Sequence, residues 1–106
     1  SAKLWREMSE YLSCGSEASQ WLSELLSSTS RSFIRDGIAD DQVSVRNKAG
    51  WISEDGCYST CNAGLIDVDG HSYVMSIMTS MPWSDQSSEA VAAIAKALYD
   101  VRSSLA

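Results

Sequence analysis

The decapeptide VSVRNKAGWI, residues 43–52, decides the fold, because the hydrophobic period of the chain changes there from 3.6 residues to 2. Within it, Val43, Val45, Ala49 and Trp51 alternate with polar residues and glycine. This alternation is typical of a strand that is buried on one face and open on the other. The decapeptide therefore predicts the first strand of a sheet.

Two more strands are predicted directly after this decapeptide. A turn at 54–56 precedes a second strand over 58–68, and Asp69-Gly70 carries the signal of a tight hairpin. A third strand over 72–81 is almost continuously apolar, which indicates burial on both faces, and Pro82 ends it. Three successive strands joined by short turns predict an antiparallel meander, ordered third, second, first, with residues 72–80 at an edge.

Helical patterns stand on both sides of the predicted strands. Apolar residues recur at helical spacing over 4–12 and 18–26, and a short helix is predicted to end near Asp36-Gly37. Residues 84–103 form the strongest helical pattern, rich in alanine. We therefore predict an α+β fold over residues 1–106 as a single unit: N-terminal helices, a three-stranded antiparallel meander and a C-terminal covering helix.

Composition restricts the possible functions. A net charge of −6, with no Lys or Arg between Lys48 and Lys96, argues against nucleic-acid binding, which needs a basic surface. No apolar run approaches the ~20 residues that span a bilayer. Cys57 and Cys61 have neither a second cysteine pair nor histidines to complete a zinc site, since His71 is the only histidine. We expect no metal, no cofactor and free, mostly buried thiols.

The segment from Arg46 to Ile52, together with the hairpin and helix that follow, resembles a known family. Lys48-Ala49-Gly50-Trp51-Ile52 and the strands and last helix after it are similar to the C-terminal portion of class A β-lactamases, penicillin-binding proteins and related serine hydrolases. The resemblance begins near Leu4 and closes with the helix that contains Leu98. It implies part of the β-lactamase/transpeptidase-like fold, with this chain as a C-terminal fragment.

The resemblance also implies roles for four residues of the first strand. Lys48 would be the lysine of the family's Lys-[Ser/Thr]-Gly motif and would help to hold a substrate carboxylate. Ala49 would be the middle motif residue, and Gly50 would let substrate approach the strand backbone. The backbone N–H of Trp51 would be one of two oxyanion-hole donors. Lys48 and Trp51 are thus the catalytic candidates, and Lys48, Ala49 and Gly50 the substrate-binding ones. The alternative for Lys48 is a solvated strand lysine.

Several features depart from the family's pattern. Ala49 stands where the family carries Thr or Ser, and no arginine lies between Cys57 and Asp69, where some relatives have one for the substrate carboxylate. Neither Ser-x-x-Lys nor Ser-x-Asn occurs in the 106 residues. We therefore expect the chain alone to be inactive, and the parent protein to transfer acyl groups from β-lactams, peptides or esters. The alternative is a non-catalytic interaction module that retains the fold.

The resemblance also suggests partners and a location. The partners would be a small-molecule or peptide substrate and the N-terminal portion of the same domain. The apolar strand over 72–80 predicts a homo-oligomer that forms through its exposed edge. Relatives are exported or anchored to a membrane, which implies an extracytoplasmic location.

Overall fold

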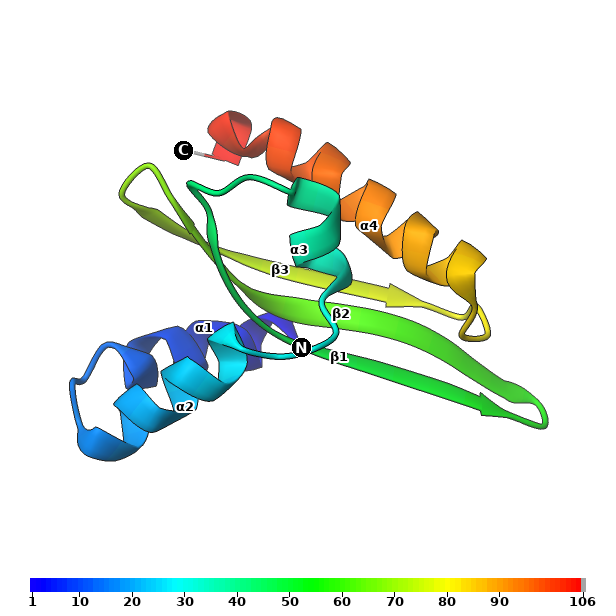
Figure 1. Cartoon of the computed structure of the whole chain (residues 1–106), viewed down its shortest axis with the longest axis horizontal. Helices are drawn as coiled ribbons and strands as arrows, with labels where there is room; N and C mark the ends of the chain where they lie inside the picture. Colours follow the sequence, from blue (N-terminus) through cyan, green and yellow to red (C-terminus); the bar gives the residue numbers. More distant parts are fainter. Residues whose placement is uncertain (106) are drawn as a thin grey trace.

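In the computed structural model, which describes residues 1–105, helices and strands follow one another in the predicted α+β order (Figure 1). Three helices precede a three-stranded sheet, and a fourth helix with a short 3-10 turn follows it. The elements are α1 (Ala2–Leu12), α2 (Glu17–Ser27), α3 (Phe33–Ile38), β1 (Ser44–Glu54), β2 (Cys57–Val68), β3 (His71–Thr79), α4 (Asp85–Asp100) and η1 (Arg102–Leu105).

The sheet is an antiparallel meander in the order β1-β2-β3, which confirms the predicted topology. Two-residue turns join the strands, at Asp55-Gly56 and at Asp69-Gly70. Both turn glycines have φ near +75°, a conformation that side chains disfavour. The register places Gly50 opposite Cys61, and Asn62 between Ala49 and Ile77.

Two pairs of helices cover the two faces of the sheet (Figure 1). The larger core lies beneath α3 and α4, and the smaller one lies beneath α1 and α2, where Trp5 and Leu65 are buried. Because side chains alternate along a strand, odd-numbered residues of β1 face α3 and α4. The larger core consists of Phe33, Ile34, Ile38, Val45, Ala49, Ile66, Val68, Met75, Ile77, Val91 and Ala95.

The edge strand β3 is less buried than its sequence predicts. Met75 and Ile77 lie in the larger core, but Met78 is 61% exposed on the opposite face. The expectation of burial on both faces is therefore wrong within the described residues. Helix α1 covers only part of that face, so the apolar run continues past the helix that shields it.

Helix α3 ends close to the predicted position near Asp36-Gly37. The helix continues to Ile38, and Ala39 after it takes the left-handed conformation with φ of 47°. A Cβ atom at Gly37 would lie 2.1 Å from the backbone oxygen of Ala92 in α4. The glycine therefore permits the close approach of α3 to α4.

The cysteines are free, but their predicted burial is wrong. Cys14 and Cys57 are exposed and Cys61 is partly exposed, because the first two lie in a helix connection and beside a hairpin turn. Within residues 1–105 no helix combines the length and apolar character that a membrane crossing requires.

Candidate functional site

Strand β1 divides the four candidate residues between its two faces. Lys48 and Gly50 lie on the face toward α1 and α2, and both are exposed. Ala49 is buried in the larger core, and Trp51 beyond it is 40% exposed. The four residues are therefore contiguous in sequence but reach two different environments, which meet at the strand backbone.

Lys48 stands between two hollows. One, of about 420 Å³, lies under α1 and α2 and is mostly apolar; Cys61 and Met78 line it with Lys48. The other, of about 230 Å³, lies beside the loop that precedes α3. The Lys48 ammonium donates to the backbone oxygen of Ala49, and no carboxylate of residues 1–105 forms an ion pair with it.

The smaller hollow, which we call the cation pocket, contains a second positive charge. Its lining residues are Thr29, Ser30, Arg31, Lys48, Ala49 and Trp51. Two cations and two hydroxyl groups thus surround the cation pocket, and no acidic residue lines it. In a chain with a net charge of −6, this concentration of positive charge favours an anion.

Arg31 is a functional candidate that sequence reasoning missed. Some relatives carry an arginine on the strand after β1, where this chain has none, whereas Arg31 belongs to the serine-rich loop before α3, which has no periodic pattern. In the sequence, only the residue type marked Arg31 as a candidate. Its place beside Lys48 depends on hydrogen bonds between the loop and Asn47, which is distant in sequence.

Asn47 holds this loop against β1. Its side chain is fully buried, its Nδ2 donates to the backbone oxygen of Arg31 at 3.1 Å, and its Oδ1 accepts from the Thr29 hydroxyl at 2.7 Å. A buried amide whose polar atoms are all bonded fixes its partners firmly. Asn47 therefore positions the loop residues of the cation pocket relative to Lys48, its own neighbour in sequence.

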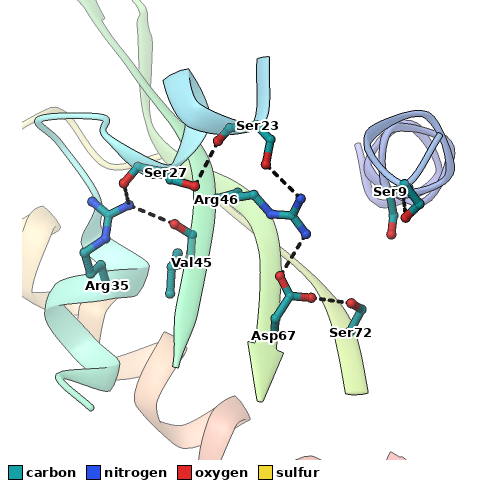
Figure 2. Close-up of polar contacts among 9 residues, drawn as sticks. Ser9, Ser23, Ser27, Arg35, Val45, Arg46, Asp67 and Ser72 are labelled. Atoms are coloured by element: carbon teal, nitrogen blue, oxygen red, sulfur yellow. Dashed lines mark hydrogen bonds and ion pairs between the residues drawn. The ribbon is translucent and has the colours of Figure 1, made fainter. Parts of the chain in front are cut away.

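Two arginines fasten the same region to the sheet and to α2. Figure 2 shows Arg35, which donates to the backbone oxygens of Ser27 and Val45 at 3.1 and 2.9 Å. It also shows Arg46, which donates to Ser23 at 3.2 Å and pairs with Asp67 at 2.8 Å. The terminal nitrogens of both guanidinium groups bond to the fold, and the Nε of Arg46 is buried without a partner among residues 1–105, so neither group is exposed to a ligand.

Two tryptophans stack at the rim of the cation pocket. The rings of Trp51 and Trp83 have centroids 4.9 Å apart and an interplanar angle of 18°. The Arg31 guanidinium carbon lies 5.5 Å from the centroid of Trp83, within the range of a cation–π interaction. The aromatic contact therefore helps to place the Arg31 charge without occupying its N–H donors.

Gly50 is not explained by packing within the chain. A Cβ atom built there meets nothing within 4 Å, whereas at Gly64 it would lie 2.3 Å from the backbone oxygen of Arg46. Gly50 also lacks the positive φ of the turn glycines. The open space in front of Gly50 is thus accessible to a molecule outside the chain.

One polar atom beside Ala49 lacks a partner. Asn62 is fully buried, and its Oδ1 accepts from the backbone N–H of Ile34 at 2.9 Å. Its Nδ2 finds no acceptor in the part of the chain that the structure describes. Ala49 is the cross-strand neighbour of Asn62 on β1, and it carries only a methyl group.

Comparison with known proteins identifies a family. A family model described as a beta-lactamase enzyme family, Beta-lactamase2, matches residues 1–101, which include every element from α1 to α4. Neither the curated proteins nor the solved structures include a match.

Proposed function

Because this chain belongs to the beta-lactamase enzyme family, we propose that it supplies the carboxylate-binding strand of an acyl-transfer site. The observation that carries the proposal is the cation pocket, where Lys48 and Arg31 face a hollow that no acidic residue lines. A carboxylate there would meet two cations. Charge-assisted hydrogen bonds contribute about 1.5–3 kcal/mol each, more than neutral ones.

Arg31 compensates for two departures of this chain from the family's pattern. Ala49 cannot donate a hydroxyl hydrogen bond, and β2 carries no arginine. Ser30 and Arg31 line the same pocket from the loop before α3, whereas the Thr29 hydroxyl already donates its hydrogen to Asn47. The loop before α3 would thus provide the polar contacts that the strands lack.

Gly50 and Trp51 have complementary roles in this proposal. The open space at Gly50 lets an acyl group lie against the strand backbone. The backbone N–H of Trp51 would then donate to the oxyanion that forms when a nucleophile attacks the carbonyl carbon. Since the 106 residues contain no Ser-x-x-Lys, the attacking serine has to come from outside them. β-Lactams, peptides and esters share this carbonyl chemistry.

A binding titration tests the proposal on the chain itself. Benzylpenicillin, a carboxylate, is added while the backbone amide signals of residues 29–31 and 48–51 are followed by NMR. Lys48→Ala and Arg31→Ala should each weaken binding by about tenfold, the effect of roughly 1.4 kcal/mol. Lys96→Ala is the matched control, because its ammonium pairs with Asp100 on α4. Equal affinities for all three variants would refute the carboxylate role.

A turnover assay completes the test. The chain alone should hydrolyse nitrocefin no faster than buffer, because it lacks the nucleophile. The same chain joined to the N-terminal portion of its domain should hydrolyse it, or at least be acylated by a fluorescent penicillin. Turnover by the 106 residues alone would show that another side chain acts as the nucleophile.

The alternative is a non-catalytic interaction module, and one observation favours it. Helix α4 carries an exposed apolar stripe beside its buried one, at Ala93, Ile94, Ala97, Leu98 and Val101. Such a stripe suits a protein partner. Absence of acylation in the complete protein, with binding through α4 retained, would support this function instead.

A further inference from the structure

Exposed aromatic rings gather next to the cation pocket. Trp51 and Trp83 are each 40% exposed, and Tyr58 is 48% exposed. Thr60 is the cross-strand partner of Trp51, so Tyr58, two residues away on β2, lies diagonal to Trp51 on the same sheet face. We call these three residues the aromatic patch.

The Trp83 part of the aromatic patch is fixed from both sides. The backbone N–H of Trp83 donates to the Ser53 hydroxyl at 3.1 Å, which ties it to β1. The residue before Pro82 is held as well, because the Thr60 hydroxyl donates to the Met81 backbone oxygen at 2.9 Å. On the other side, Ser84 begins α4 with a capping box. These bonds fix the backbone at Trp83, and its ring stacks on Trp51, so the ring loses little conformational entropy when a ligand binds.

The aromatic patch and the cation pocket share one residue, Trp51. Trp51 lines the cation pocket with Lys48, and Arg31 lies over the ring of Trp83. A ligand whose carboxylate is held by Lys48 and Arg31 therefore has its adjoining atoms beside the aromatic patch. An aliphatic chain would gain only apolar burial there, whereas a planar ring can also stack on the indoles.

From this juxtaposition we propose that the aromatic patch is a specificity subsite that binds a planar, unsaturated ring attached to the ligand's carboxylate. The inference rests on the proposed function and narrows its substrate class to carboxylates with a conjugated or aromatic ring close to the carboxyl carbon. Trp83 and Tyr58 select the ring, and Lys48 and Arg31 hold the charge. The two halves of the site can be separated by substitution.

Three small carboxylates test the inference on the 106-residue chain. Acetate, cyclohexanecarboxylate and benzoate are titrated separately, and the indole N–H signals of all four tryptophans are followed by NMR. Benzoate should bind about threefold to tenfold more tightly than either of the others, with shifts at Trp51 and Trp83. Trp5, which is buried, and Trp21, which is exposed on α2, are the internal controls for non-specific association.

Substitutions distinguish failure of this inference from failure of the proposed function. Tyr58→Leu, on β2, should reduce the preference for benzoate while acetate binding stays within twofold. Trp83→Leu should abolish the preference and, because Arg31 lies over its ring, should also weaken acetate binding. Lys48→Ala should weaken all three ligands. Benzoate binding no better than acetate or cyclohexanecarboxylate would overturn the subsite and leave the proposed function intact. Failure of all three to bind, or equal shifts at Trp21, would overturn both.

Discussion

The unpartnered amide of Asn62 makes Ala49 a testable position. A serine hydroxyl at position 49 would lie across the strand pair from Nδ2, at Cβ separations of roughly 4.5–5.5 Å, and could accept its hydrogen. Ala49→Ser should raise the free energy of unfolding by about 1 kcal/mol, measured by urea denaturation. Ala63→Ser, also buried on the neighbouring strand, is the control and should destabilise the chain. Similar losses for both variants would contradict this account.

Cys14 gives a second prediction at the residue scale. The pKa of the Cys14 thiol is lowered from 9.0 to about 7. The largest cause is a hydrogen bond to the Ser16 side chain, followed by hydrogen bonds to the Ser16 backbone and the Ser19 side chain. The thiolate therefore predominates above about pH 7, and alkylation of Cys14 by iodoacetamide should rise with a midpoint there. Ser16→Ala should move this midpoint upward. A midpoint near 9 in the unsubstituted chain, followed by mass spectrometry of the Cys14 peptide, would contradict the prediction.

At the scale of elements, α3 and α4 approach each other only because residue 37 is glycine. Gly37→Ala would place a methyl carbon against the Ala92 backbone oxygen, which cannot give way as a side chain can. We expect a loss of more than about 2 kcal/mol in the free energy of unfolding. Gly50→Ala, where the added carbon meets nothing, is the matched control and should be neutral in stability while it weakens ligand binding. Equal stability of the two variants would refute the close-packing argument.

The sheet was predictable from the sequence, whereas part of the candidate site was not. The period of 2 after Val43 and the Asp69-Gly70 turn are local signals, and they predicted the order of the sheet correctly. The motif from Lys48 to Ile52 is also a local signal, and it identified β1 as the candidate strand. Arg31 and Trp83 could not be predicted as site residues, because each lies in a loop without a periodic pattern. Their positions depend on hydrogen bonds to distant residues, Arg31 to Asn47 and Trp83 to Ser53. The role of Gly37 in the contact between α3 and α4 was not predicted, because a glycine at a helix end and a glycine at a helix contact look alike in sequence.

At the scale of the whole molecule, the free edge of β3 predicts association. A mostly apolar hollow of about 330 Å³ lies along it between Val74 and Leu98, and β3 carries no Lys, Arg, Asp or Glu. We propose that two copies pair through this edge, since unblunted edges recruit further strands. Light scattering at high micromolar concentration should report a dimer or larger assembly, and Ser76→Lys should shift it toward the monomer. A clean monomer for the unsubstituted chain would contradict the proposal.

Asn47 and Lys48 are adjacent, yet one is sealed inside the fold and the other is open to solvent. The same alternation continues through Ala49 and Gly50. Substitutions along this segment are therefore expected to affect folding and ligand binding at alternating positions. Substitutions at positions 47 and 49 would be filtered by whether the chain still folds, and those at 48 and 50 by what it binds. Ligand specificity could therefore change through positions 48 and 50 while the buried positions 47 and 49, and with them the stability of the fold, stay the same.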